Sequence, residues 1–370
     1  MSAEIAYQNY KELSVQGRYV VGSNITQFLN KELRHVTVNE IGKSVLDHPI
    51  SMITMGTGPT RILMWSQMHG NEATTTKAVL DLINYLEGDT TQSTSILQSC
   101  TLYIIPILNP DGAAAYTRSN ANKIDLNRDA QDLSQPESRV LRSVFETTKP
   151  HFCFNLHDQR TMYNVGNTPK PATVSFLAPA YDKDRNVSKT RGISMQLVVA
   201  MNRKLQKSIP GQIGRYDDAF NANCVGDAFQ MEQVPTVLFE AGHFPEDYKR
   251  EKTRVYIFMA LQEAISVIAN GTIGEYKQDH YLEIPENSKQ FMDIIIRNAH
   301  VLHEPLNEGM ALGIFYEETL VEGKIVFIPV LAQKGKLDRY FGHQVYNCLD
   351  HNDLEALKAN KALTDMIAKI

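Results

Sequence analysis

The sequence predicts an α/β protein in which a mixed, mostly parallel twisted sheet is covered by helices on both faces and is followed by a small β-rich C-terminal domain. Apolar strand-like runs alternate with helical patterns from residue 50 to about residue 270, and several of these runs are apolar throughout. Such runs are typical of strands buried on both faces, and the alternation favours a sheet between two helical layers. Because the pattern changes after residue 274, we expect domains at residues 1–274 and 275–370.

The predicted strands of the larger domain are short runs of mainly Val, Ile, Leu and Phe. We expect an outer strand at 36–41 and further strands at 50–55, 61–67, 101–107, 152–156, 173–177 and 236–239. Helices are expected at 72–86, 135–147, 185–207 and 251–269. In sheets of this kind, binding groups collect at strand ends and in the loops that follow them.

The predicted C-terminal domain consists of strand-like segments separated by turns rich in Gly, Pro and Asn. These segments are 281–297, 311–330 and 339–347, and a break at 270–274 precedes them. A final helix is expected at 353–369. Asn352 is its expected N-cap, because a glutamate follows three residues later.

Composition and charge narrow the class of protein. The chain of 370 residues is 43% hydrophobic and 21% charged, as is usual for a globular enzyme, and its net charge of −5 with no basic block predicts no nucleic-acid partner. No apolar stretch is long enough to cross a membrane, and residues 1–10 lack the basic and apolar parts of a secretory signal. The four cysteines form no C-x-x-C pair, which is typical of free thiols, so we expect a cytoplasmic protein.

The most informative motif is His69-x-x-Glu72, which lies between the predicted strand 61–67 and the predicted helix 72–86. Gly70 allows the backbone to turn sharply there. A histidine and a glutamate three residues apart on one helical turn can point at a single metal ion. The pair also fits an ordinary helix start, where the helix dipole favours Glu72. A catalytic zinc needs in addition a third ligand, an open position for water and a base.

Two later segments supply the missing groups. His157 follows the predicted strand 152–156 and gives a third ligand, although a core or surface histidine is the alternative interpretation. Glu240 closes the predicted strand 236–239, where a carboxylate is costly to bury without a partner but is useful as a general base. Glu240 is otherwise a solvent-facing residue, or it forms a second metal pair with His243.

Two polar loops are candidates for binding an anion. Arg118 and Arg128 lie ten residues apart in a segment rich in Asn and Asp. Arginine binds carboxylates through two parallel hydrogen bonds and stabilises a developing oxyanion. Tyr216, in a loop before Glu240, carries a phenolic proton that can be donated to such an anion. Ordinary surface arginines and an ordinary loop tyrosine are the alternative interpretations.

Taken in chain order, these segments resemble the zinc metallocarboxypeptidases, the carboxypeptidase A-like peptidases. The resemblance spans about residues 50 to 270 and implies the fold of that family. The matching residues are His69-x-x-Glu72, Asn109-Pro110-Asp111-Gly112, Arg118, Asp125-Leu126-Asn127-Arg128, His157 and Glu240.

The resemblance implies one Zn²⁺ per chain, with His69, Glu72 and His157 as ligands. It implies that Glu240 is the base that activates water and that Arg118 stabilises the oxyanion.

The resemblance also implies how the substrate is held. Asn127 and Arg128 grip its free α-carboxylate, and Tyr216 matches the carboxylate-capping tyrosine of the family. The substrate is then a peptide that is shortened from its C-terminus. Three residues are expected to line the specificity pocket, namely Cys224, Val225 and Asp227.

Other functions remain open at this point. The β-rich tail and short loops also resemble the aspartoacylase and succinylglutamate desuccinylase-like deacylases, whose substrates are N-acyl amino acids with a free carboxylate. Asp158 departs from the peptidase pattern, in which a small hydroxyl residue follows the third ligand. A zinc-binding scaffold without activity would have no need of Glu240. A serine hydrolase is excluded because the chain has no Gly-x-Ser-x-Gly elbow.

Overall fold

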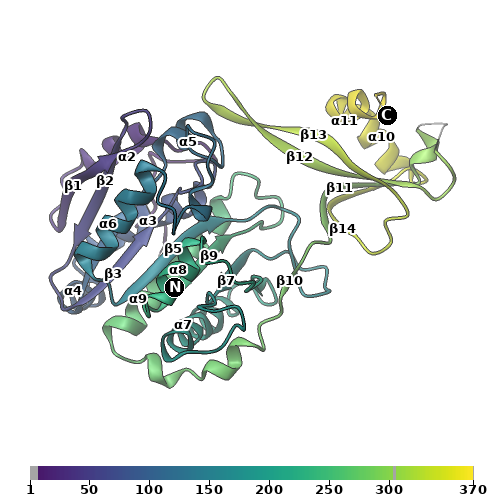
Figure 1. Ribbon diagram of the computed structural model, residues 1–370. Helices are drawn as coiled ribbons and strands as arrows, with labels where there is room; N and C mark the ends of the chain where they lie inside the picture. The colour runs from purple at the N-terminus through teal and green to yellow at the C-terminus, as the bar shows by residue number, and fades with distance from the viewer. Residues whose placement is uncertain (1–6, 303–305, 370) are drawn as a thin grey trace.

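The computed structural model describes residues 7–302 and 306–369. Within them, a large α/β unit is followed by a smaller unit built on a second sheet (Figure 1). The large unit contains an eight-stranded sheet in the order β1-β2-β4-β3-β5-β9-β7-β8. Its strands are β1 (Val36–Lys43), β2 (Pro49–Met55), β3 (Thr60–Trp65), β4 (Cys100–Ile105), β5 (Phe152–Asp158), β7 (Val174–Leu177), β8 (Ile213–Arg215) and β9 (Thr236–Ala241).

The centre of this sheet is parallel. Strand β3 pairs in parallel with β4 and β5, and β5 pairs in parallel with β9. Antiparallel pairs join β1 to β2, β2 to β4 and β7 to β9. Because the central strands run in the same direction, the ends of β3, β5 and β9 lie at one edge of the sheet, which is where the predicted site residues follow them.

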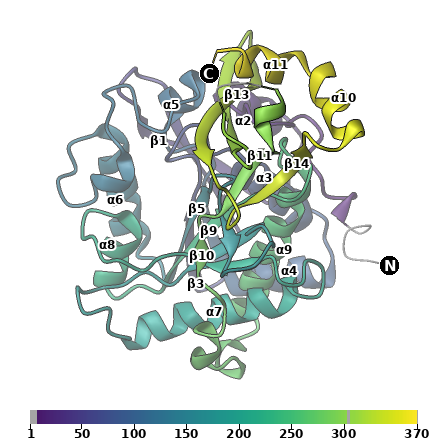
Figure 2. The same ribbon diagram turned by 90° about the vertical axis from the view of Figure 1, so that its right-hand side faces the viewer.

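Helices cover both faces of the large sheet, as predicted, and Figure 2 shows α6 and α8 on one side with α4 and α9 on the other. Residues 62–65 of β3 are all apolar because both faces of the strand are buried: Ile62 and Met64 belong to one core, and Leu63 and Trp65 belong to the other. The helices are α2 (Gly22–Leu29), α3 (Thr74–Leu86), α4 (Thr91–Ser99), α5 (Pro110–Ala115), α6 (Pro136–Thr148), α7 (Lys189–Leu205), α8 (Val225–Met231) and α9 (Glu251–Ala269).

The predicted elements recur with small shifts at their ends, and the expected fold class is confirmed. Helix α9 has the predicted bounds, and the strands differ by one or two residues. Helix α7 begins at Lys189 rather than 185, because the Ser188 side chain caps it. Helix α3 begins at Thr74, so Glu72 precedes the helix and does not lie in its first turn.

The smaller unit is a four-stranded sheet in the order β13-β12-β11-β14. The predicted strand-like segment 311–330 forms most of a hairpin, in which Glu322 and Gly323 both adopt positive φ and reverse the chain. The strands are β11 (Phe291–Arg297), β12 (Ala311–Val321), β13 (Lys324–Gly335) and β14 (Phe341–Asn347).

The single helix expected at 353–369 is two helices, α10 (His351–Ala359) and α11 (Lys361–Ile367). Asp350 caps α10 in place of the expected Asn352, and its side chain accepts hydrogen bonds from two backbone N–H groups. Asn360 lies between the helices, with extended backbone, and caps α11.

Residues 273–288 pack against the large unit. Tyr281 is buried in its core, and β10 (Asn287–Ser288) pairs with β6 (Asn164–Val165). The first strand of the second sheet, β11, follows these contacts. The expected division at residue 274 stays a prediction.

The hairpin β12–β13 contacts the large unit near the C-terminal end of α5 (Figure 1). Glu318 on β12 accepts a hydrogen bond from the Tyr116 hydroxyl and forms an ion pair with Arg18 at 3.1 Å. The guanidinium of Arg160 packs over the Phe315 ring, 5.5 Å from its centre. Within the described ranges, no helix has the length and apolar character needed to cross a membrane.

Candidate active site

Three predicted residues are positioned by the ends of the central parallel strands. His157 on β5 and Glu240 on β9 are register partners in neighbouring strands. His69 lies in the turn after β3, where Gly70 is required because a Cβ there would come within 1.9 Å of the Gly112 carbonyl carbon. The Asn109-Pro110-Asp111-Gly112 motif therefore holds the turn that carries His69.

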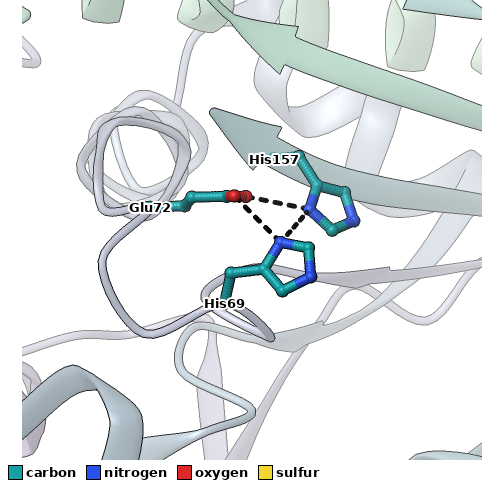
Figure 3. A group of neighbouring side chains, drawn as sticks. All are labelled: His69, Glu72 and His157. Carbon is teal, nitrogen blue, oxygen red and sulfur yellow. Dashed lines mark hydrogen bonds and ion pairs between the residues drawn. The ribbon is translucent and has the colours of Figure 1, made fainter. Parts of the chain in front are cut away.

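His69, Glu72 and His157 converge on one point (Figure 3). The Nδ1 atoms of His69 and His157 lie 2.9 Å from separate oxygens of the Glu72 carboxylate. The two Nδ1 atoms are 3.0 Å apart. All three side chains are buried, and within the described residues they form the cluster of His, Cys, Asp or Glu ligands that can hold a metal. Two imidazole nitrogens and a carboxylate directed at one point are a donor set that suits Zn²⁺.

Burial and facing charges shift the pKa values of all three side chains in this cluster. Burial alone would raise the pKa of the Glu72 carboxyl, but the facing imidazoles of His69 and His157 outweigh it and hold that pKa well below its usual range. Burial lowers the pKa of the His157 imidazole, which favours the neutral form that binds metals. Burial also acts to lower the pKa of the His69 imidazole, but Glu72 and Asp125 outweigh it and raise that pKa.

Asp125 orients the first ligand and was not predicted to do so. Its Oδ1 lies 3.0 Å from His69 Nε2, the nitrogen that faces away from the cluster. The same carboxylate accepts hydrogen bonds from the Asn127 backbone N–H at 2.9 Å and from Arg118 Nε at 3.1 Å. A carboxylate behind a ligating imidazole fixes its tautomer and raises its basicity. Its place in the Asp125-Leu126-Asn127-Arg128 motif was the only signal of this role in the sequence.

Asp158, which departs from the peptidase pattern, joins the third ligand to helix α3. Ala73 offers no side-chain cap to this helix, and the Asp158 carboxylate accepts a hydrogen bond from the Thr74 backbone N–H at 3.0 Å instead. The Asp158 backbone N–H donates to Glu72 Oε2 at 3.1 Å. The residue after His157 therefore fixes both the helix that follows Glu72 and the Glu72 carboxylate.

Replacing Asp158 by Ala is expected to lower the free energy of unfolding by about 1–2 kcal/mol, because helix α3 loses its N-terminal acceptor. Urea unfolding followed by circular dichroism measures the change. Asp158→Asn keeps one acceptor oxygen and is the matched control, so it should lose less stability. Equal stability of the wild type and Asp158→Ala would contradict this capping role.

Glu240 is buried, and its Oε2 has no hydrogen-bond partner among the described residues. Burial, and then the nearby carboxylates of Glu72 and Asp158, raise the pKa of Glu240 well above its usual value. A divalent cation between the three ligands would act in the opposite direction. A buried carboxylate with a free oxygen beside the cluster is the placement that a proton-transferring base requires.

Arg118, Asn127 and Arg128 surround the cluster. Arg118 Nη1 lies 3.2 Å from Glu72 Oε1, and its side chain is half exposed. The Asn127 side chain accepts a hydrogen bond from the Val225 backbone N–H at 2.9 Å. Arg128 Nη1 donates to the Asn127 carbonyl at 2.7 Å and lies 3.1 Å from Cys224 Sγ. Arg128 forms no ion pair with a described carboxylate, so its charge is available to a ligand.

The predicted residues share one cleft of about 380 Å³. It is lined by all eight residues predicted for the site, namely His69, Glu72, Arg118, Asn127, Arg128, His157, Tyr216 and Glu240. Tyr163 was missed, and its hydroxyl lies 2.8 Å from that of Tyr216. Burial, and then the Glu240 carboxylate, raise the pKa of the Tyr216 phenol, which keeps it a proton donor.

One sequence expectation is corrected at the edge of the site, and one alternative interpretation is not supported. Val225 packs in a core cluster with Phe229 and does not line the cleft, whereas Cys224 and Asp227 do. His243 does not join the metal cluster, and its ring packs in a tilted orientation against the rings of Tyr248 and His343 instead.

Comparison with known proteins gives a consistent result. The family described as zinc carboxypeptidase matches residues 23–232. A probable carboxypeptidase 2 of Arthroderma benhamiae is 24% identical over 161 residues, which are 42% of this chain and 30% of that protein. Carboxypeptidase SOL1 of Arabidopsis thaliana is 29% identical over 182 residues, which are 40% of this chain and 37% of that protein. The chain therefore matches only about a third of the length of these relatives.

A solved structure supports the fold. The metallo-carboxypeptidase of Burkholderia cenocepacia superposes with a TM-score of 0.55 at 19% identity, covering 68% of this chain and 69% of that one. At this identity the similarity shows a common fold, including the mixed sheet flanked by helices.

Proposed function

This chain belongs to the zinc carboxypeptidase family, and on that premise we propose that it removes C-terminal amino acids from peptides by zinc-dependent hydrolysis. The observation that carries the proposal is the convergence of His69, Glu72 and His157 beside the unpaired carboxylate of Glu240. Arg128, whose charge is free, lines the same cleft and suits a substrate that ends in a carboxylate.

We assign His69, Glu72 and His157 as the ligands of one zinc ion. Their donor atoms leave at least one position open, and both histidines present the same ring nitrogen. Zinc supplies a Lewis acid that polarises the scissile carbonyl and acidifies a water molecule. Asp125 holds the His69 ring in place from behind, as a positioning residue.

Glu240 is the base in this proposal. It takes a proton from the attacking water as the new C–O bond forms at the scissile carbonyl carbon. It then delivers that proton to the peptide nitrogen as the C–N bond breaks, so an amine and a carboxylic acid are released, and the acid loses its remaining proton to solvent. Arg118 stabilises the negative charge that develops on the carbonyl oxygen.

The carboxylate of the substrate is assigned to Asn127, Arg128 and Tyr216. Arg128 forms the ion pair, Asn127 is held by its bond to the Val225 backbone, and Tyr216 donates its phenolic proton. A grip on a free α-carboxylate restricts hydrolysis to the last peptide bond. The N-acyl amino acid deacylase alternative is not favoured, because the relatives named above are carboxypeptidases.

The proposal predicts about one zinc per chain and release of C-terminal amino acids. Metal analysis of the purified full chain measures the first. The second is measured with peptides that differ in their C-terminal residue, including cell-wall peptides, assayed beside N-acyl amino acids. The same peptides with an amidated C-terminus are the matched control and should not be cleaved. Turnover of N-acyl amino acids alone would overturn the peptidase assignment, and absence of zinc after reconstitution at neutral pH would overturn the metal site.

A further inference from the structure

Arg250 is a buried arginine that holds the ends of two strands together. It is 1% exposed, stands at the start of α9 and does not line the cleft. Its Nη1 donates to the Ala241 carbonyl at 2.7 Å, and its Nη2 donates to the Gln159 carbonyl at 2.9 Å. Ala241 ends β9 and Gln159 directly follows β5, so one guanidinium bridges both strands at the edge of the sheet that carries the site.

This bridge lies next to two residues of the proposed mechanism. Glu240, the proposed base, directly precedes Ala241, and His157, a proposed zinc ligand, stands two residues before Gln159. Past the last register pair of the two strands, the Gln159 backbone N–H also donates to the Ala241 carbonyl at 2.9 Å. Arg250 therefore fixes the strand end that carries the ligand to the strand end that carries the base.

The main chain around Arg250 is itself held in place. Arg250 adopts a left-handed conformation with a φ of 58°, which is uncommon for a residue other than glycine. The backbone N–H groups of the next three residues, 251–253, donate to the Asp247 side chain at 2.8, 2.7 and 3.0 Å. Asp247 thus satisfies the first turn of α9, and the Arg250 side chain is left to reach the strand ends.

The charge of Arg250 acts on the same site. Burial, and then the guanidinium of Arg18, lower the pKa of Arg250 to about 10, so it remains a cation at neutral pH. Burial and neighbouring carboxylates raise the pKa of Glu240, whereas the cations of Arg118 and Arg250 act against that rise. The buried cation therefore also favours the anionic form that a base requires.

Arg254, one turn further along α9, shows what a buried arginine with a purely structural role looks like in this chain. It is 0% exposed, pairs with Asp81 at 2.6 Å, and donates to the carbonyls of Val15 and Glu12 at 2.9 and 2.8 Å. None of these partners lines the cleft. Arg254 holds the N-terminal segment, whereas the bonds of Arg250 end beside the site.

We propose that Arg250 is a positioning residue for the reaction: it sets the place of Glu240 relative to His157 by tying together the strand ends that carry them. The inference rests on the proposed function, which gives these two residues their roles. Unlike a purely structural role, it predicts a loss of turnover and of zinc affinity in protein that is still folded. Lysine keeps the charge but lacks the planar fork that reaches two carbonyls at once.

The test compares Arg250→Lys with the matched control Arg254→Lys in the zinc-loaded full chain. Each removes a buried guanidinium from α9, so both should lower the free energy of unfolding. With folding checked by circular dichroism and rates expressed per bound zinc, Arg250→Lys should lower kcat about 10- to 100-fold and change KM by less than about threefold. Arg254→Lys should retain kcat. Arg250→Gln, which places no charge in the core, should lose at least as much kcat and serves if Arg250→Lys does not fold.

Zinc affinity, measured by competition with a chelator of known affinity, tests the inference without turnover. We expect Arg250→Lys to weaken zinc binding about 10-fold, since it loosens the strand end that holds His157, and Arg254→Lys to leave it unchanged. That difference supports the positioning role even if no peptide is cleaved, and then only the hydrolytic proposal fails. Equal zinc affinity of the two variants, or equal kcat per bound zinc, overturns the positioning role, and cleavage of peptides by the wild type would then leave the proposed function intact.

Discussion

Glu240→Gln is expected to retain zinc and to lose about 10²- to 10⁴-fold in kcat. Glutamine has nearly the shape of glutamate but cannot take a proton from water. Glu240 is not among the proposed metal ligands, so the metal content should not change. Removing a buried negative charge beside Glu72 and Asp158 also relieves repulsion, so the variant should fold at least as stably as the wild type.

The experiment combines metal analysis, thermal unfolding and steady-state kinetics on one preparation. Glu246→Gln, an exposed change six residues along the chain, is the matched control and should keep full activity. If Glu240→Gln turned over substrate at the wild-type rate, Glu240 would have no part in proton transfer. Loss of zinc together with activity would instead place Glu240 among the ligands.

His157→Ala is expected to have the second large effect, which is loss of zinc and, with it, of activity. Removing one of three ligands weakens metal binding more than removing a residue behind a ligand, which typically costs about 10- to 100-fold in affinity. Competition with a chelator of known affinity measures the change. Asp125→Asn should therefore fall between His157→Ala and the wild type, because it loosens His69 without removing a ligand.

His351→Ala is the control for the loss of a histidine, since this residue is exposed on α10, in the smaller unit. It should bind zinc as the wild type does. An unchanged zinc affinity in His157→Ala would show that the metal binds elsewhere. We therefore expect zinc affinity to be lowest in His157→Ala, intermediate in Asp125→Asn and unchanged in His351→Ala. This order tests the arrangement of the site more sharply than any single variant does.

Much of the fold was predictable from local sequence. Residues 62–65 of β3 are apolar because both faces of the strand are buried there, and α9 has a long apolar pattern whose ends coincide with the observed helix. The elements that were missed are short or polar. Helix α4 is mainly Ser, Thr and Gln, and β8 has three residues, so neither gives a clear periodic signal.

The residues of the candidate site likewise fall into two groups, those that the local sequence predicted and those that it did not. His69-x-x-Glu72 was recognisable because its spacing is local, and the other predicted residues stand at strand ends or in motifs. Asp125 and Asp158 were not assigned roles, because each acts through partners that are distant in sequence. The His69–Asp125 contact spans 56 residues and the Thr74–Asp158 contact spans 84, so only the folded chain brings them together.

The contact between the β12–β13 hairpin and the large unit has a consequence for the chain as a whole. Arg18 is 8% exposed, and its ion-pair partner, Glu318, comes from the other end of the sequence. Excising the smaller unit would remove the anion that pairs with this guanidinium and would uncover the apolar and polar surface on which the hairpin rests, so we expect it to be destabilising. Removing the smaller unit would also expose Arg160, which lines the cleft and whose guanidinium packs over the Phe315 ring. The C-terminal quarter is therefore no detachable appendage: it neutralises a charge inside the enzyme and supports part of its substrate cleft.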